Sequence, residues 1–399
     1  MNMNKIAFNI LTVPVLAVLA VSCGGQDEIY KEWVKKGGYD YPAKAINLSS
    51  VIGYQNVIVN WEKPMDPAVR TATLFWDNYA KSIDVDYADY PDGKVSIKVG
   101  ELEDRSYTFD IVNYDDVGNK SLAAEITVSP YGDGWMVSRS ERTVSSARME
   151  GRDAKIVMSK ATDEMVATRF RYKNLQDEWV ESETVLKPGE NEVTFKDAMK
   201  GKRFEYSSSF CPKDGKDTVW RTWTKSVDGI SYQIDGSRWN VTATNGQYFG
   251  INTPEKIFDG RYDRPAYSWH SSKSDNNKQA FPKILSVDTQ TSTGEEFAFT
   301  GFTFCENNTA ASLRYIKDYT IYVGSSYYNP DDADYLKNFG IPFIGGTLST
   351  SADQYSVNVT QGATGRYMAI VFKNSWNADD GFIDLWELIP YGYIPSLAD

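Results

Sequence analysis

The chain has 399 residues, 41% of them hydrophobic and 14% aromatic, which excludes a wholly disordered or collagen-like chain and supplies apolar side chains for several buried cores. Acidic residues outnumber basic ones by 54 to 42 and give a net charge of −12, which opposes attraction to a phosphate backbone, so nucleic acid is not an expected partner. His270 is the single histidine, which excludes catalytic or metal sites that need two imidazoles from this chain.

The N-terminal segment has the features of an export signal. Lys5 is followed by an apolar run from Ile6 to Val21, which is typical of a signal peptide and is shorter than the ~20 residues that span a bilayer. The stretch from Leu19 to Gly24 resembles a bacterial lipobox, in which small residues precede a cysteine that is acylated. The resemblance implies a signal peptide over residues 1–22 and a lipidated Cys23. The alternative is an ordinary secretory signal with an incidental thiol.

Residues 23–37 form the expected tether behind the acylated cysteine. Its acidic patch, Gln26-Asp27-Glu28, resembles the export signal of Bacteroidetes lipoproteins that reach the outer face of the outer membrane. Lipid chains would hold the protein at that surface through buried methylenes, at ~0.8 kcal/mol each. The expected localisation is therefore the outer membrane, lipid-anchored and exposed at the cell surface.

The next part of the chain contains a weak internal repeat. Four short motifs recur in the same order at an offset of 96 to 98 positions. The first copy includes Val57–Trp61, Asp66-Pro67, Thr73–Trp76 and Tyr107–Ile111, and the second includes Lys155–Ser159, Asp163-Glu164, Phe170–Tyr172 and Phe204–Tyr206. A repeat of this length indicates two tandem copies of one domain, which we place at residues 38–138 and 139–228.

Both copies have the pattern of β-structure. Val95, Ile97 and Val99 alternate with polar residues, which is the period-2 pattern of a strand with one buried face. The segment from Leu102 to Tyr107 resembles a tyrosine corner, in which the phenol bonds back to upstream backbone. Each copy is therefore expected to be an immunoglobulin-like or fibronectin type III-like sandwich. Such domains space other modules and rarely perform chemistry.

The first copy also resembles a known family. The segment from Tyr30 to Thr143, with Lys36-Gly37-Gly38-Tyr39 and the strand around Trp61, resembles an uncharacterised family of N-terminal domains in Bacteroidetes lipoproteins. That resemblance implies no activity for this part of the chain.

Residues 229–399 form the third predicted domain, with longer loops rich in Gly, Asn, Asp and Ser. Its ordered motifs are Trp239–Ala243, Ile257–Gly260, Tyr267–His270, Tyr319–Ser325, Gly365–Ile370 and Glu387–Gly392. They resemble the discoidin, or coagulation-factor type C, domain, a jelly-roll β-sandwich shared with family 32 carbohydrate-binding modules. The predicted fold class is thus all-β: two tandem sandwiches followed by a discoidin-like jelly roll.

Two loops of this third domain carry the candidate ligand-binding residues. Trp376 and Asn377 place an indole beside an amide, which suits a sugar because its ring presents apolar C–H faces and a rim of hydroxyls. The resemblance places the loop from Glu306 to Arg314 at the same end of the sandwich, where it supplies Asn308 and Arg314, and His270 is a further candidate. The alternatives are that Trp376 packs down as a loop plug, that Arg314 makes a surface ion pair and that His270 is an ordinary loop residue.

A structural calcium ion is also implied by the resemblance. The matching positions are Asp259, Ser268 and Glu387, and Asp263 is a further candidate ligand, because Ca²⁺ collects carboxylate and carbonyl oxygens from neighbouring loops. The insert 261–266 adds two arginines near the site, which disfavour a nearby dication. Ordinary turn and surface roles for these acids are the alternative.

The expected function is non-catalytic binding of carbohydrate. The sequence contains no Gly-x-Ser-x-Gly elbow, P-loop, dinucleotide fingerprint or His-Glu-x-x-His motif, so an enzyme is not expected. The partners expected from the resemblances are a glycan, outer-membrane lipid, and the transporter and lipoprotein partners of a glycan-uptake system. The alternative is a structural or adhesion scaffold whose third domain binds a protein.

Overall fold

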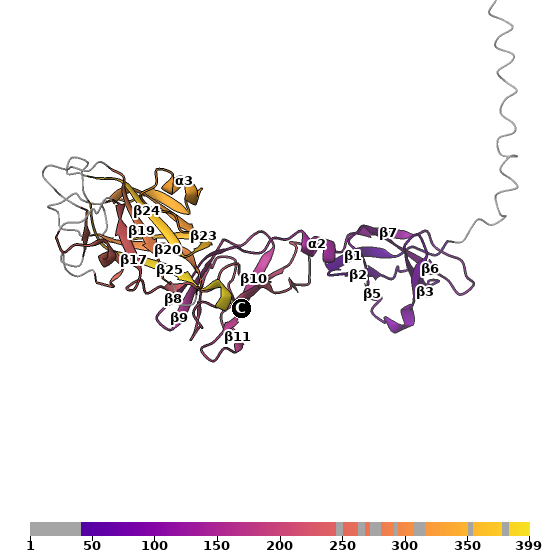
Figure 1. The fold of residues 1–399 in the computed structure, drawn as a ribbon. Helices are drawn as coiled ribbons and strands as arrows, with labels where there is room; N and C mark the ends of the chain where they lie inside the picture. The colour runs from indigo at the N-terminus through magenta and orange to yellow at the C-terminus, as the bar shows by residue number, and fades with distance from the viewer. Residues whose placement is uncertain are drawn as a thin grey trace, which may run out of the picture. The chain divides into compact units, whose positions relative to one another are not determined.

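The computed structural model describes residues 41–244, 250–261, 268–271, 281–290, 294–306, 316–349, 354–376 and 383–399. In this part of the chain there are two compact units, one ending at Asp133 and the other beginning at Gly134. Both consist mainly of antiparallel sheets (Figure 1), so the predicted all-β class is confirmed. No helix among the described residues is long and apolar enough to cross a membrane.

The first unit is a sandwich of two sheets with the strand orders β1-β2-β5 and β4-β3-β6-β7. Its elements are β1 (Ile46–Gly53), β2 (Asn56–Glu62), β3 (Thr71–Trp76), β4 (Lys81–Asp86), η1 (Tyr87–Asp89), β5 (Lys94–Val99), β6 (Tyr107–Tyr114) and β7 (Ala124–Val128). In β5, Val95 and Val99 are buried, whereas Lys94, Ser96 and Lys98 are exposed. The predicted alternation of this strand is confirmed, and it places the apolar residues in the core between the sheets.

The tyrosine corner predicted in the first unit is present. Tyr107 is buried at the start of β6, and its hydroxyl oxygen accepts a hydrogen bond of 3.0 Å from the backbone N–H of Glu103. The guanidinium of Arg105 lies 3.9 Å from the centroid of the Tyr107 ring. The corner therefore fixes the loop that precedes β6 to the edge of the core.

The second unit begins with another sandwich, preceded by α2 (Asp133–Val137), which spans the boundary between the units. Its two sheets have the orders β12-β9-β8 and β11-β10-β13-β14, with β15 also paired to β13. The strands are β8 (Val144–Glu150), β9 (Asp153–Met158), β10 (Met165–Lys173), β11 (Trp179–Glu181), β12 (Glu192–Phe195), β13 (Glu205–Phe210), β14 (Val219–Trp220) and β15 (Thr224–Lys225). The repeated motifs fall on corresponding strands, since β2, β3 and β6 of the first sandwich recur as β9, β10 and β13.

One face of β10 carries a ladder of cations and indoles. Phe170 and Tyr172 point into the core, so the arginines and lysine that alternate with them lie on the opposite face. The cation–indole pairs and their distances to the ring centroid are Arg169–Trp220 (4.5 Å), Arg169–Trp223 (4.6 Å), Arg171–Trp223 (4.7 Å), Lys173–Trp179 (5.4 Å) and Arg171–Trp179 (5.5 Å). Contacts of this kind contribute about 0.5–1 kcal/mol each at exposed sites.

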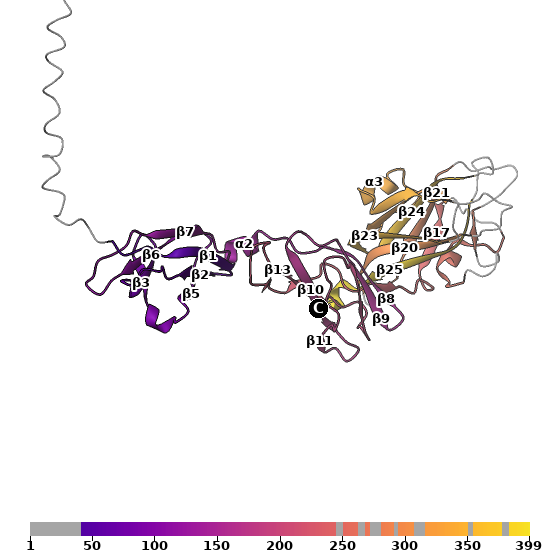
Figure 2. The ribbon, with the colours of Figure 1, turned by 180° about the vertical axis from the view of Figure 1, so that it is seen from behind.

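The rest of the second unit is a jelly roll of two facing sheets (Figures 1 and 2). Their orders are β16-β25-β20-β23, with β18 paired to β25, and β17-β19-β24-β21-β22. The elements are β16 (Tyr232–Gln233), β17 (Asn240–Ala243), η3 (Pro254–Phe258), β18 (Trp269–His270), β19 (Lys283–Asp288), β20 (Phe297–Glu306), β21 (Ile316–Gly324), α3 (Tyr335–Phe339), β22 (Ile344–Thr347), β23 (Gln354–Gly365), β24 (Tyr367–Ser375), β25 (Asp384–Tyr393) and η5 (Pro395–Leu397). Aromatic residues from both sheets, including Trp269, Phe302 and Phe372, fill a common core.

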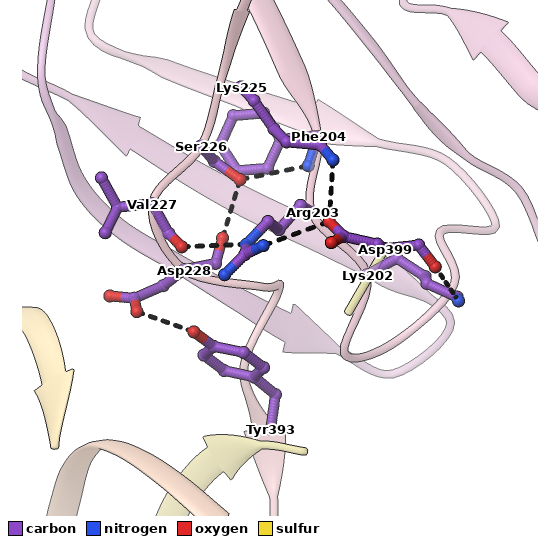
Figure 3. Close-up of polar contacts among 9 residues, drawn as sticks. All are labelled: Lys202, Arg203, Phe204, Lys225, Ser226, Val227, Asp228, Tyr393 and Asp399. Carbon is purple, nitrogen blue, oxygen red and sulfur yellow. Dashed lines mark hydrogen bonds and ion pairs between the residues drawn. The ribbon is translucent and has the colours of Figure 1, made fainter. Parts of the chain in front are cut away.

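Polar contacts join the second sandwich to the last residues of the jelly roll (Figure 3). The Tyr393 hydroxyl donates to Asp228 Oδ1 at 2.9 Å. Asp399 Oδ1 lies 3.1 Å from the Arg203 guanidinium and 2.7 Å from Lys225 Nζ. Since β25 ends at Tyr393, the chain returns along this strand to the sandwich from which the jelly roll began.

Candidate functional site

The jelly roll gathers residues that are distant in sequence at one end. Here β20 and β24 finish and β21 and β25 begin, and the register pairs Glu306 with Leu385 and Ile316 with Ser375. We call this part of the domain the distal end. Trp376, the main candidate residue, directly follows β24 at the distal end.

Trp376 is both anchored and open to solvent. Its indole Nε1–H donates a hydrogen bond of 3.0 Å to the carbonyl oxygen of Leu348, and Lys317 Nζ lies 4.7 Å from the ring centroid. The residue nevertheless remains 41% exposed. The two contacts hold the ring in one orientation while part of its apolar surface faces solvent, so the indole combines features of a loop plug and of a stacking platform.

A polar depression lies on β21, β22 and β24, and its lining includes Asp318, Thr320, Thr347, Lys373 and Asn374. Thr347 donates its hydroxyl to Asp318 Oδ1 at 2.5 Å, and Asn374 Oδ1 accepts from the Asp318 N–H at 2.9 Å. Hydrogen bonding of the Asp318 carboxylate to the side chain of Thr347, and then to that of Asn374, lowers the pKa of Asp318. The depression therefore offers a carboxylate, an amide, hydroxyls and an ammonium group, all of which bond sugar hydroxyls.

Glu306 is a buried carboxyl at the distal end that the sequence pattern does not reveal. We expected it to begin a loop, but it is the last residue of β20 and is only 3% exposed. Its Oε1 accepts a hydrogen bond of 2.7 Å from the Ile316 N–H. Burial, followed by the nearby charge of Asp384, raises the pKa of Glu306 to about 8. A mainly protonated Glu306 thus ties the end of β20 to the start of β21 at neutral pH.

His270 lies on the short strand β18, where it pairs with Asp384 of β25. Its backbone N–H donates to the carbonyl oxygen of Asn252 at 3.3 Å, and its side chain is half-buried. The neighbouring Trp269 is fully buried in the core. The histidine therefore lies on the opposite side of β25 from the strand end that carries Glu306.

The structure brings together two of the predicted calcium ligands. Glu387 is 3% exposed and accepts a hydrogen bond of 3.2 Å from the Gly260 N–H. Burial, with a further contribution from the charge of Asp259, raises the pKa of Glu387 to about 8, and burial also raises the pKa of Asp259. Ser268 Oγ accepts from Asn252 Nδ2 at 3.1 Å.

The chemistry of this pair suits a hard cation, because a bound metal ion stabilises both the buried Glu387 and the half-buried Asp259 as anions. Nevertheless, the described residues contain no cluster of three or more His, Cys, Asp or Glu side chains that could hold a metal. The remaining predicted ligand, Asp263, lies outside the described residues.

Four other predicted residues also lie outside the described part of the chain: Cys23, Asn308, Arg314 and Asn377. The structure adds groups that the sequence analysis missed, namely Lys317, Asp318 and Glu306. Lys317 and Asp318 carry no distinctive motif, and only the pairing of β21 with β24 places them near Trp376.

Comparison with solved structures finds several β-sandwich proteins. The family 32 carbohydrate-binding module of C. perfringens NanJ, solved in complex with galactose, is 18% identical with a TM-score of 0.32, over 41% of this chain and 99% of that one. A SusE-like protein, BT2857, is 10% identical with a TM-score of 0.31, and the match covers 87% of this chain and 97% of that one. Discoidin II of Dictyostelium discoideum is 13% identical with a TM-score of 0.28, and the match covers 41% of this chain and 58% of that one.

Comparison by sequence gives one family match. Residues 23–217 match the family DUF4998, a domain of unknown function. No curated protein matches the chain. The matched range covers the first sandwich and most of the second and stops before the jelly roll.

Proposed function

We propose that this chain binds carbohydrate without catalysis, at the distal end of its jelly roll and around Trp376. The observation that carries the proposal is the indole itself, which is fixed by Leu348 and Lys317 and is 41% exposed. A pre-oriented aromatic face lowers the entropic cost of stacking a sugar ring. The polar groups around Asp318 and Asn374 supply hydrogen bonds to the hydroxyl rim.

The experiment is affinity electrophoresis of the complete chain in gels that contain a panel of neutral polysaccharides. We expect at least one polysaccharide to retard the wild type, Trp376→Ala to abolish the retardation, and Trp376→Phe to restore part of it because a smaller ring still stacks. Trp179→Ala is the matched control, since Trp179 is 45% exposed and lies on the second sandwich. Equal retardation of Trp376→Ala and the wild type would refute the site.

The remaining parts of the proposal concern the setting of this activity. A lipid on Cys23 would anchor the protein to the outer membrane, with its sandwiches as spacers and a transporter and partner lipoprotein of a glycan-uptake system alongside. Labelling with palmitate tests the anchor, since the label must disappear in Cys23→Ser. Capture of a protein rather than a glycan at the distal end would favour the adhesion scaffold.

Calcium is proposed as a structural ion held by Asp259 and Glu387. When bound, it would neutralise the negative charge of two carboxylates whose pKa values burial raises. These residues lie beside η3 and β25, so their part is to fix the turn after η3 to the sheet rather than to contact the sugar.

A further inference from the structure

A groove separates the second sandwich from the jelly roll, away from the distal end. It has a volume of about 390 Å³, and its walls include residues 143–148 on the sandwich side and Thr300, Asn358 and Gln361 on the jelly-roll side. The two strands that face each other across it, β8 and β23, are the terminal strands of their sheets. The volume and position of the groove are typical of ligand sites, which occur preferentially where domains meet.

The floor of the groove is fixed by the contacts of Figure 3. Asp228, which lines it, accepts hydrogen bonds from the Tyr393 hydroxyl at 2.9 Å and from the Gly362 N–H at 3.1 Å. At Gly229 the backbones pack so closely that an added Cβ would lie 2.1 Å from the carbonyl oxygen of Gly201. The two domains therefore meet through a dense, bonded contact, and the groove beside it is preformed.

Arg148 supplies a cation to this groove, and no ion pair with a described residue holds it. Its guanidinium lies 3.5 Å from the centroid of the Tyr391 ring and donates to Asn358 Oδ1. Among the described residues, no carboxylate lies within ion-pair distance of Arg148. Burial lowers its pKa, and the charges of Tyr391 and Glu150 oppose that shift without cancelling it. Other arginines of the same sandwich are paired with carboxylates: Arg139 with Glu164, Arg152 with Asp197, Arg171 with Glu205 and Arg203 with Asp399.

Such a cation needs an anion of matching geometry. A guanidinium stacked on a ring keeps its fork of N–H donors in one plane, which suits the two oxygens of a carboxylate. The rest of the lining includes the hydroxyls of Ser145, Ser146 and Thr300 and the amide of Gln361, which bond sugar hydroxyls. The Asp228 carboxylate also lines the groove, and its two oxygens accept hydrogen bonds from Tyr393 and Gly362. A partner with one carboxylate and several hydroxyls matches this set.

We propose that the groove is a second glycan site, which binds a uronic-acid unit of an acidic oligosaccharide with its carboxylate on Arg148. This site is independent of Trp376, because it lies at the junction of the domains. It gives the chain a preference for acidic glycans in addition to the binding proposed at the distal end.

The test is isothermal titration of the complete chain with digalacturonate and, separately, with a neutral galactose disaccharide. We expect digalacturonate to bind and Arg148→Gln to weaken it at least tenfold, with affinity falling as NaCl rises because the contact is ionic. Arg152→Gln, which removes the same charge from an exposed position of the same sandwich, should leave the affinity unchanged. Trp376→Ala should also leave it unchanged, which separates this site from the distal one.

A second variant keeps the test valid if Arg148→Gln disturbs the junction. Ser145 is exposed in the wall of the groove, so Ser145→Trp should fill the cavity while Arg148 and the contacts of Figure 3 remain. We expect it to abolish binding of digalacturonate. The proposal is overturned if the wild type does not bind digalacturonate, if it binds the neutral disaccharide equally well at this site, or if both variants bind like the wild type.

Discussion

Glu306 makes the stability of the jelly roll depend on pH, and Glu306→Gln is predicted to remove its share of that dependence, while the share of Glu387 remains. Its pKa is raised from the ordinary 4.5 to about 8, chiefly by burial. Between these values the folded state keeps a proton that the unfolded state has released, so the free energy of unfolding falls as pH rises. At about 1.4 kcal/mol per pKa unit, the loss reaches at most about 5 kcal/mol by pH 9.

Glutamine keeps the oxygen that accepts from the Ile316 N–H but does not ionise. Variant and wild type should therefore be equally stable near pH 5, and the variant should be more stable by about 2–5 kcal/mol near pH 9. Urea unfolding of the complete chain, followed by tryptophan fluorescence at both pH values, measures the difference. Glu255→Gln, at an exposed position of the same domain, is the control. If Glu306→Gln and the wild type lose stability in parallel as pH rises, the carboxyl is not held protonated and the reasoning fails.

Three further predictions concern the corner, the ladder and the metal site. Tyr107→Phe removes the acceptor of a backbone hydrogen bond and should lower the free energy of unfolding in urea by about 1–3 kcal/mol. A change near zero would mean that the tyrosine corner does not stabilise the fold. Trp223→Leu loses two cation–π contacts and should cost about 1–2 kcal/mol, whereas Trp223→Phe should cost less; equal losses would assign the effect to packing alone. Millimolar CaCl₂ should raise the melting temperature of the wild type but not of Glu387→Gln, and more so above pH 8, because binding releases the proton; an unchanged wild type would exclude the ion.

The sequence predicts the fold well where the information is local. Alternation identified β5, and the spacing before Tyr107 identified the corner, because both depend on residues a few positions apart. The repeat placed corresponding strands correctly, since tandem copies share one pattern of buried positions.

The site could be predicted only in part, because its contacts join distant segments. Glu306 was expected in a loop, and its burial follows from the pairing of β20 with β25. The ladder depends on arginines of β10 meeting indoles about 50 positions later in the chain. Arg148 and Tyr391 come from different domains, and no local motif indicates that they stack.

The return of β25 to the second sandwich has a practical consequence for work with this protein. β25 has ten residues, which at about 3.3 Å per residue separates its two ends by roughly 30 Å. Trp376 lies at one end of this span, and Asp399 lies at the other, against Arg203. A fluorophore joined at Asp399 would therefore report on the contact between the domains. An affinity tag at the same position would attach the chain to a surface with the Trp376 indole directed away from it.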